Sequence, residues 1–486
     1  MRWPFSVLVP LTLLVLALGC GGAQPSVVLI SIDSLRADVP GSEVAGRPLT
    51  PVLDRFARQA TVYTRAISAA PWTTPAMMSV MTGLGSGVHG VEEHDRALAS
   101  TVPTLAERFR AAGYRTAAFT PAVTLRAEYG FSRGFEVYDQ DNFGHNRLSS
   151  PTLVGKVLAR LEEWKDEPFF IWVHLWDPHY NYIPPAPWNG YFRTGRQPPR
   201  DDVQCLKWVE NPVSPEEAQW FKGQYDGEVA YTDQHLGQIL DQVKKLGLEE
   251  TTVVAVMADH GEAFLEHGWL GHTNRLDETL IHVPLMVRQP GAEGRRIDSV
   301  VPVAGLGRSL LELAAIDGRD FGDLPALPAA VQTPADERPV LSRTLRRGCW
   351  TALSTTRFKY LLEHRQCREF LFDLEQDPGE TTDLSATQPE RLLELRAALS
   401  VELERGASLR VARSMLPREI IEQAEARLRS IGYVGGAPTG GGDSKEVTCA
   451  KIAAPGRVDA FGDAAAQPCP EGAVHACLEV LGKQQP

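Results

Sequence analysis

The hydrophobic positions of this chain fall into short continuous runs separated by stretches of helical spacing. Continuous apolar runs are typical of strands buried on both faces of a parallel sheet, and they occupy residues 26–32, 169–175 and 252–258. Residues 115–119 are predicted to form a further strand. Before the last run, apolar residues recur at helical spacing from Phe221 to Val243, which predicts a long amphipathic helix. Strands that alternate with helices predict an α/β fold, with a mostly parallel sheet sandwiched by helices.

Capping signals mark where three of the helices begin. Thr50 precedes a proline, a pattern that predicts an N-cap followed by the first helical turn. Residues 104–107 and 214–217 have the spacing of capping boxes. Gly113 and Gly247 can end the second and third of these helices.

The pattern changes beyond a segment rich in proline and alanine at residues 325–337. Short apolar segments there predict antiparallel strands, at residues 350–356, 358–362 and 370–374. Leucine spacing predicts a helix from 389 to about 404 that packs on these strands. We therefore expect a small C-terminal α+β subdomain over residues 338–434. A Gly-rich linker and a cysteine-containing tail follow at 435–486.

The N-terminus has the pattern of an export signal. Arg2 precedes an apolar run from Val7 to Leu18, which suits a signal peptide and is short for a membrane span. The following Cys20 ends a segment, Ala-Leu-Gly-Cys, that resembles a bacterial lipobox. This predicts a lipoprotein signal peptide at residues 1–20, lipidation of Cys20, and anchoring in the bacterial envelope, in the outer membrane. The alternative is an ordinary signal peptide with an incidental cysteine.

Composition narrows the classes of partner. The net charge of −12 gives no electrostatic support to a nucleic-acid partner, so we expect none, and we expect membrane contact through the N-terminal lipid only. Six cysteines remain besides Cys20, and an even number in an exported chain predicts disulfides. Cys349 and Cys367 flank a predicted hairpin and are the expected pair.

Two carboxylates follow apolar runs directly. Asp33 comes after the run at 26–32, and Asp259 and His260 come after the run at 252–258. Active sites in such sheets lie beyond the carboxyl ends of the strands. A buried carboxylate is costly unless it meets a cation or a donor. Two carboxylates with an imidazole therefore predict a site for one divalent metal ion, with Ca, Mn, Mg and Zn all open.

The segment Ser68–Gly83 resembles the sulfatase signature, in which a Cys or Ser begins a Cys-x-Pro-x-Arg run and a Thr-Gly follows. Here Thr73 stands at the position of the Cys or Ser, and Met77 at that of the Arg. Further segments match the order and spacing of sulfatases, at residues 50–55, 89–91, 177–179 and 282–285. The chain thus resembles the sulfatase family of the alkaline phosphatase superfamily from about residue 26 to 432.

The resemblance implies an alkaline-phosphatase-like fold with a catalytic domain over residues 26–324. It implies a metal centre whose ligands are Asp33, Asp259, His260 and the oxygen of Thr73. It also implies that His179 and His272 contact the anionic head or the leaving oxygen of the substrate, as catalytic residues beside Thr73. Thr74 is the alternative nucleophile.

Departures from the sulfatase pattern bear on the reaction. In sulfatases the leading Cys or Ser is oxidised to formylglycine, whereas Thr73 is a secondary alcohol and cannot give that aldehyde. Ser34 replaces a second Asp, and residues 120–123 lack the Lys-x-His pair usual in the family. We therefore expect metal-dependent cleavage of phosphate or sulfate esters through Thr73, with phosphoesters ahead of sulfate.

Two other functions stay open from the sequence. One is a transferase that moves a phosphoalcohol onto an envelope glycan or lipid. The other is a catalytically silent protein that keeps the fold to bind an anionic glycan. In the favoured reading the partner is an anionic ester substrate linked to a glycan or a lipid.

Overall fold

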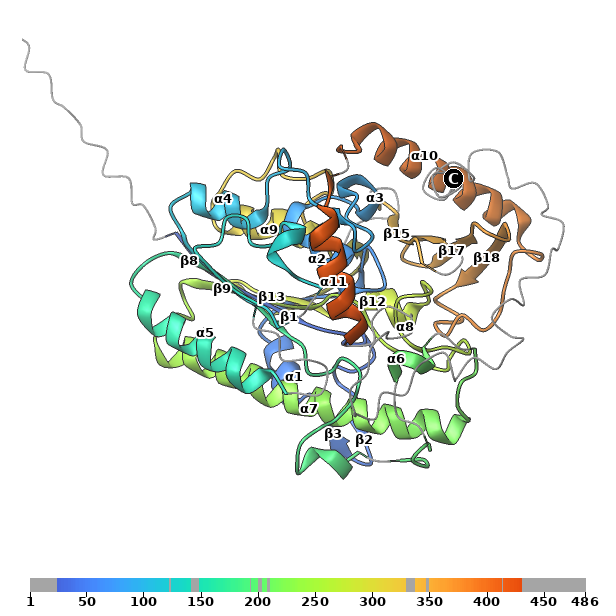
Figure 1. The fold of residues 1–486 in the computed structure, drawn as a ribbon, viewed down its shortest axis with the longest axis horizontal. Coiled ribbons are helices and arrows are strands. Elements are labelled where there is room, and N and C mark those ends of the chain that lie inside the picture. The colour runs from blue at the N-terminus through green and yellow to red at the C-terminus, as the bar shows by residue number, and fades with distance from the viewer. Residues whose placement is uncertain are drawn as a thin grey trace, which may run out of the picture.

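The computed structural model describes residues 24–430, except 122–123, 141–147, 193, 200–202, 208–209, 329–336, 347–348 and 413. The predicted signal peptide, Cys20 and the tail at 435–486 lie outside the described residues. Figure 1 shows a central twisted sheet with helices on both faces and a smaller sheet with its own helix beside it. None of the described helices is long and apolar enough to cross a membrane.

Within the described residues the central sheet has nine strands, in the order β12-β4-β13-β9-β1-β8-β6-β7, with β14 also paired to β4. Their bounds are β1 Ser26–Ile32, β4 Thr61–Ile67, β6 Arg115–Phe119, β7 Val137–Asp139, β8 Phe169–Leu175, β9 Thr252–Ala258, β12 His282–Val283, β13 Leu285–Arg288 and β14 Arg295–Pro302. Strands β9, β1, β8, β6 and β7 are mutually parallel, whereas β12 and β13 run antiparallel to their neighbours. The predicted α/β fold with a mostly parallel sheet is confirmed.

Helices cover the two faces of this sheet. Their bounds are α1 Pro51–Ala57, α2 Thr73–Thr82, α3 Ser86–His89, α4 Leu105–Ala111, α5 Ser150–Trp164, α6 Val203–Leu206, α7 Pro215–Lys245, α8 Glu278–Ile281 and α9 Gly305–Leu313. Figure 1 shows α2, α4 and α9 on one face and α1, α5 and α7 on the other. Both predicted capping boxes are present, at Thr104 on α4 and Ser214 on α7.

The predicted cap of α1 is wrong in its chemistry, although the helix begins where expected. The Thr50 hydroxyl donates to Asp54 and makes no hydrogen bond to the helix backbone. Instead the backbone N–H groups of Val52 and Leu53 donate to the Asp233 carboxylate of α7, at 2.9 and 2.8 Å. Burial raises the pKa of Asp233 to about 6. The Asp233 carboxylate of α7 thus caps the start of α1, which Thr50 was expected to do.

The C-terminal subdomain is a four-stranded antiparallel sheet with one long helix across it. Its elements are β15 Val340–Thr344, β16 Trp350–Ser354, β17 Phe358–Glu363, β18 Arg368–Asp373 and α10 Pro389–Leu409. Leu392, Leu395 and Leu399 of α10 pack on Leu353 and Leu371 of the sheet. Strand β15 was not predicted, and α10 extends beyond its expected end at 404.

Short elements complete the described chain. They are β2 Glu43–Val44, β3 Arg47–Pro48, β5 Arg96–Ala97, β10 Ala263–Phe264, β11 Leu270–Gly271, β19 Ser414–Met415, the 3₁₀ turns η1 Ala127–Tyr129 and η2 Trp188–Gly190, and α11 Arg418–Ser430. Cys349 precedes β16 and Cys367 lies in the turn before β18, and both are disulfide-bonded.

Strand β15 connects the subdomain to the segments beside Thr73 and His272 through hydrogen bonds. The Ser342 hydroxyl donates to the Ser68 carbonyl at 2.6 Å, and the Arg343 N–H donates to the Ala69 carbonyl at 3.0 Å. The Thr344 hydroxyl donates to the Thr273 carbonyl at 3.1 Å. One strand of the subdomain therefore bonds both the chain before Thr73 and the chain after His272.

A buried ion network lies at the same junction. Lys359 of β17 is fully buried, and its ammonium is 2.8 Å from Glu380 and 3.4 Å from Glu278 of α8. Glu380 also accepts a hydrogen bond from the Glu278 N–H at 2.6 Å. Burial alone would raise the pKa of Glu278, but Lys359 and Arg65 hold it at about 2. His267, Asp277 and Glu380 could also hold a metal ion by their spacing, yet Lys359 already neutralises this cluster.

Replacing Lys359 by methionine is expected to lower the free energy of unfolding by about 3–5 kcal/mol, because it leaves the buried Glu380 carboxylate without its cation, whereas Glu278 keeps its pair with Arg65. Urea denaturation at neutral pH measures the change. The matched control is Arg319→Ala, which breaks an exposed pair with Asp317 and should leave the denaturation midpoint unchanged. A Lys359→Met protein as stable as the control would contradict the network's role.

Candidate active site

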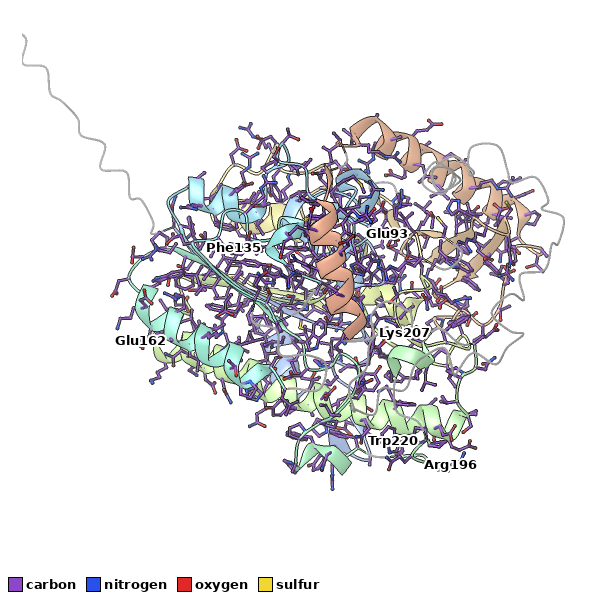
Figure 2. All side chains as sticks on the ribbon, viewed as in Figure 1. Glu93, Phe135, Glu162, Arg196, Lys207 and Trp220 are labelled. Atoms are coloured by element: carbon purple, nitrogen blue, oxygen red, sulfur yellow. The ribbon has the colours of Figure 1, made fainter. Side chains whose placement is uncertain are left out.

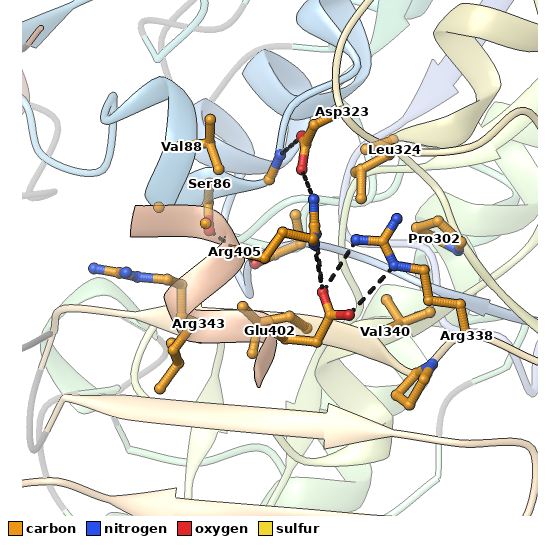
Figure 3. Close-up of a pocket in the computed structure, with 18 of the residues that line it drawn as sticks. Ser86, Val88, Pro302, Asp323, Leu324, Arg338, Val340, Arg343, Glu402 and Arg405 are labelled. Atoms are coloured by element: carbon orange, nitrogen blue, oxygen red, sulfur yellow. Dashed lines mark hydrogen bonds and ion pairs between the residues drawn. The ribbon is translucent and has the colours of Figure 1, made fainter. Parts of the chain in front are cut away.

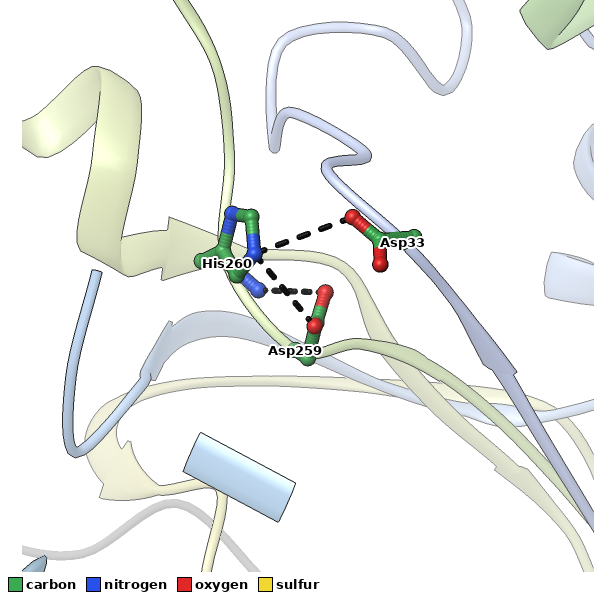
Figure 4. A group of neighbouring side chains, drawn as sticks. All are labelled: Asp33, Asp259 and His260. Carbon is green, nitrogen blue, oxygen red and sulfur yellow. Dashed lines mark hydrogen bonds and ion pairs between the residues drawn. The ribbon is translucent and has the colours of Figure 1, made fainter. Parts of the chain in front are cut away.

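Three ionisable side chains meet where two central strands end. Strands β1 and β9 are parallel neighbours with Ile32 opposite Ala258, so the next residues, Asp33 and Asp259, emerge side by side. Figure 4 shows both carboxylates turned toward the His260 ring. Nε2 of His260 is 3.7 Å from Asp33 Oδ1 and 3.4 Å from Asp259 Oδ2. All three side chains are buried, and their ligand atoms lie close enough to hold one metal ion.

The hydrogen bonds around this cluster leave a nitrogen lone pair and a carboxylate oxygen available to bind a cation. Nδ1 of His260 is 2.9 Å from the Gly261 carbonyl, which can only accept, so Nδ1 carries the proton and the Nε2 lone pair faces the carboxylates. Oδ1 of Asp259 accepts from the backbone N–H groups of Ser34 and His260. Among the described residues, Oδ2 of Asp259 accepts no hydrogen bond although it is buried. The residues therefore fit a divalent cation bound by oxygen and nitrogen.

The pKa values of the two carboxylates shift in opposite directions, and both shifts are consistent with a cation site. Burial and the neighbouring charge of Asp33 raise the pKa of Asp259. Burial alone would also raise the pKa of Asp33, but His179, His174 and His260 hold it below its ordinary value. Two buried carboxylates this close repel each other when both are ionised, and a bound cation removes that repulsion.

Thr73 projects its hydroxyl into this cluster from the first residue of α2. Its Oγ1 is 3.4 Å from Asp33 Oδ2 and 3.3 Å from His260 Nε2. The start of a helix stabilises negative charge through its unpaired N–H groups and its dipole. The Thr74 hydroxyl instead donates to the Thr124 carbonyl at 2.7 Å. The two adjacent threonines thus face different surroundings, and only Thr73 faces the metal cluster.

His272 and His179 continue outward from His260 as a row of imidazoles. The ring centroids of His260 and His272 are 4.3 Å apart, and those of His272 and His179 are 5.0 Å apart. Nδ1 of His272 is 3.0 Å from Glu262, whose pKa is raised well above its ordinary value by burial. Nδ1 of His179 donates to the Tyr180 carbonyl at 2.6 Å. The structure therefore brings together all six residues that the sequence placed in the site.

The protein family follows from comparison with known sequences. The sulfatase family profile matches residues 25–316, more than half of the chain. The chain belongs to the sulfatase family. Membership places the chain among sulfatase-like ester hydrolases, a family of metalloenzymes.

Individual sulfatase-family relatives are distant. The chain is 28% identical over 347 residues to the ulvan-active sulfatase of Formosa agariphila, covering 62% of this chain and 65% of that protein. It is 24% identical over 459 residues to human arylsulfatase K, covering 79% and 84% of the two chains. The phosphonate monoester hydrolase of Agrobacterium radiobacter superposes with a TM-score of 0.66 at 19% identity, over 79% of this chain and 96% of that chain. The chain thus spans less than two thirds of the ulvan-active enzyme, and the solved structure shows the shared fold.

Sequence reasoning missed the surroundings of Asp33 in this sulfatase-family site. His174 belongs to none of the motifs singled out in the sequence, yet its Nε2 lies 3.0 Å from Asp33 Oδ2. Ser34, which replaces an Asp of the family pattern, donates its hydroxyl to Asp33 Oδ1 at 2.7 Å. A signal was present for the first of these, because a histidine interrupts an otherwise apolar strand three residues before Asp177.

A buried lysine was also missed. Lys207, labelled in Figure 2, directly follows α6 and has no exposed surface. Its ammonium donates to the Tyr180 hydroxyl and lies 4.6 Å from the centre of that ring. The Tyr180 ring is in turn 4.9 Å from the His272 ring. Lys207 therefore supplies a cation at the side of the site, although no motif surrounds it in the sequence.

A separate cavity of about 330 Å³ lies between α3, β15 and α10 (Figure 3). Its walls are mostly apolar, and four of its charged side chains pair with one another. Glu402 binds Arg405 at 2.9 Å and Arg338 at 3.1 Å, and Arg405 also contacts Asp323. The reactive groups are at the strand ends, so we place the active site there and not in this cavity.

Proposed function

We propose that this sulfatase-family protein cleaves anionic esters by direct attack of the Thr73 hydroxyl, with phosphoesters ahead of sulfate esters. The observation that carries the proposal is the position of Thr73 Oγ1, at a helix start and within 3.4 Å of both Asp33 and His260. The Ser34 hydroxyl also contacts this cluster, but it donates to Asp33 Oδ1 at 2.7 Å and does not lie at a helix start. A bound divalent cation would make the Thr73 hydroxyl more acidic and would neutralise charge on the transferred group.

The residues of the chain divide the reaction between them. Thr73 Oγ1 gives its proton to Asp33 Oδ2, 3.4 Å away, and forms a bond to the phosphorus or sulfur while the bond to the leaving oxygen breaks. The start of α2 stabilises the developing negative charge. His272, with its Nδ1 3.0 Å from Glu262, is placed to give a proton from Nε2 to the leaving oxygen. Such proton transfer contributes about 10²- to 10⁴-fold in rate. Water then attacks the Thr73 ester and releases the acid.

The single hydroxyl of Thr73 is the reason to favour phosphoesters. A hydrated aldehyde carries two hydroxyl groups, so one can expel a sulfate that is bound to the other. A threonine ester has no such route and must be opened by attack at the phosphorus or sulfur. Met77 stands where the sulfatase pattern has an arginine, and it is fully buried in the core. The site therefore lacks the positive charge that this arginine would supply.

The substrate is proposed to be an anionic ester carried on a glycan or a lipid. Relatives named for ulvan activity and for endo-4-O-sulfatase activity act on glycans by their names, which supports this class of substrate. We also propose that Cys20 is lipidated and holds the protein in the bacterial envelope, on the basis of the lipobox-like segment.

A panel of aryl phosphodiester, phosphomonoester and sulfate substrates tests the proposal, with Ca, Mg, Mn and Zn each supplied to the metal-stripped enzyme. We expect metal-dependent turnover of a phosphoester to exceed that of the sulfate. Sulfate turnover as the dominant activity would overturn the preference for phosphoesters. Formation of a transfer product above the hydrolysis product, when an acceptor alcohol is added, would make the protein a transferase.

Replacing Lys207 by methionine is expected to lower kcat/KM for anionic esters by about 10- to 100-fold, because a hydrogen bond or ion pair to a charged group contributes about 1.5–3 kcal/mol. The change should lie mainly in KM, since Lys207 is placed to hold the anion. Steady-state kinetics on the best substrate of the panel measures it. Lys222→Met is the matched control, because Lys222 also lies over a tyrosine ring, that of Tyr225 on α7. Equal kinetics for the two variants would exclude Lys207 from substrate binding.

A further inference from the structure

Two polar side chains face each other inside the central sheet, in strands that are otherwise apolar. Ser31 of β1 and His174 of β8 are paired in register, and neither has exposed surface. The Ser31 hydroxyl lies 2.8 Å from Nδ1 of His174. The indole N–H of Trp172, also buried, donates to the same hydroxyl at 2.9 Å. Nε2 of His174 lies 3.0 Å from Asp33 Oδ2. These contacts form one chain that ends at Asp33.

The direction of the hydrogen bonds in this chain follows from its two ends. An indole N–H can only donate, so Ser31 Oγ accepts from Trp172 and keeps its own hydrogen to donate. Its nearer acceptor is Nδ1 of His174 at 2.8 Å, against 3.4 Å to the Val173 carbonyl. At the other end an ionised carboxylate can only accept, so Nε2 of His174 carries the ring hydrogen. In every hydrogen bond of this series, the acceptor is then the group nearer to Asp33.

The second oxygen of Asp33 is held from the opposite side. The Ser34 hydroxyl donates to Oδ1 at 2.7 Å. Oδ1 thus accepts from Ser34, and Oδ2 accepts from His174 and, at 3.4 Å, from the Thr73 hydroxyl, which together fix the plane of the carboxylate. A carboxylate held in this way loses little freedom when it binds a cation, and partners of this kind typically change metal affinity about 10- to 100-fold.

We propose that Trp172, Ser31 and His174 form a positioning relay that orients Asp33 for cation binding. The relay acts through Asp33 and touches neither the cation nor the substrate. It goes beyond ester cleavage, because it depends only on the metal cluster and not on Thr73 or on the kind of ester. It also gives a role to Trp172, whose indole N–H would otherwise be a buried donor in an apolar strand.

Metal titration of the full chain by calorimetry tests the relay, with the chain stripped of metal and then titrated with MnCl₂ and, separately, ZnCl₂. His174→Ala should weaken binding by about 10- to 100-fold. His174→Gln keeps an amide donor for Asp33 and an acceptor for Ser31, so it should restore much of the lost affinity. Trp172→Phe removes only the outermost donor and should give a smaller loss in the same direction.

The matched control for Trp172→Phe is Trp164→Phe. Trp164 is as fully buried, and among the described residues its indole N–H has no hydrogen-bond partner. The same atoms are thus removed without disturbing the relay, and metal affinity should stay at the parent value. A folded His174→Ala protein with unchanged metal affinity would overturn the proposal, as would equal affinity losses for the two tryptophan variants.

A second measurement does not depend on any variant folding. In the metal-free full chain with ¹⁵N-labelled histidine rings, the His174 ring should show the Nε2–H tautomer by its nitrogen chemical shifts. The Nδ1–H tautomer would reverse the direction of the hydrogen bonds from Ser31 through His174 to Asp33, and it would overturn the relay. Failure of the relay in either test would leave ester cleavage by Thr73 untouched, because that chemistry is measured by turnover of the Thr73 variants.

Discussion

Replacing Thr73 by alanine is expected to lower kcat by at least about 10³-fold, because removal of a nucleophile takes away the covalent route and leaves only binding and charge stabilisation. The change removes a hydroxyl and a methyl group at the start of α2, where Thr73 is fully buried against Asp33 and His260. The helix itself should remain. Turnover of the best phosphoester under saturating metal measures the effect, and metal titration shows whether the cation still binds.

Thr74→Ala is the matched control for this experiment. The Thr74 hydroxyl is bonded to the Thr124 carbonyl at 2.7 Å and faces away from the cluster. It should therefore cost stability and leave kcat close to the parent value. If Thr74→Ala were inactive and Thr73→Ala active, the nucleophile would be the neighbouring threonine. If both variants retained turnover, a covalent threonine ester would be excluded, and direct attack by water would take its place.

Replacing Asp259 by asparagine is expected to weaken metal binding by more than about 100-fold, since loss of a ligand charge exceeds the 10- to 100-fold effects of outer partners. Among the described residues, the group that could hold the metal contains two carboxylates, Asp33 and Asp259, and Ser34 stands where many sulfatases carry another Asp. One lost charge is therefore half of the anionic ligand set. Calorimetric titration measures the affinity, and turnover should vanish at limiting metal and return in part at high metal concentration.

The control for Asp259→Asn is a carboxylate that also follows a central strand and is equally buried. Asp177 comes two residues after β8, but it accepts from the backbone N–H groups of Ser149 and Ser150 at 2.6 and 3.0 Å, at the start of α5. Asp177→Asn should lower stability and leave metal affinity unchanged. Unchanged metal affinity in Asp259→Asn would mean that the cation binds elsewhere.

The strands of the central sheet were predictable to different degrees. β1, β8 and β9 are buried on both faces, and they therefore appear in the sequence as apolar runs. β4 mixes buried and half-buried residues without a regular period, and β14 begins with exposed arginines.

β15 was missed for another reason, because its buried residues Ser342, Arg343 and Thr344 are polar. They are buried because distant carbonyls and Glu92 satisfy them, and a sequence does not display such partners.

The residues of the candidate site were also predictable to different degrees. The residues that sit at strand ends or in the sulfatase-like segment could be named from local sequence and resemblance. Lys207 could not, because it reaches the site from a short helix with no recognisable motif and becomes significant only when Tyr180 and His272 are beside it. The cap of α1 by Asp233 is a second example, since the two residues are separated by most of the catalytic domain.

The bonds from β15 to the segments beside Thr73 and His272 have a consequence for the order in which the enzyme matures during synthesis. Every proposed catalytic residue precedes β15 in the sequence and therefore emerges first, both during synthesis and during the proposed export. Until Ser342 and Thr344 have emerged, the carbonyls of Ser68 and Thr273 lack the donors that hold them in the finished protein. The nascent chain can therefore carry a complete set of reactive groups without their final arrangement. Activity is gained late, when the last antiparallel sheet docks.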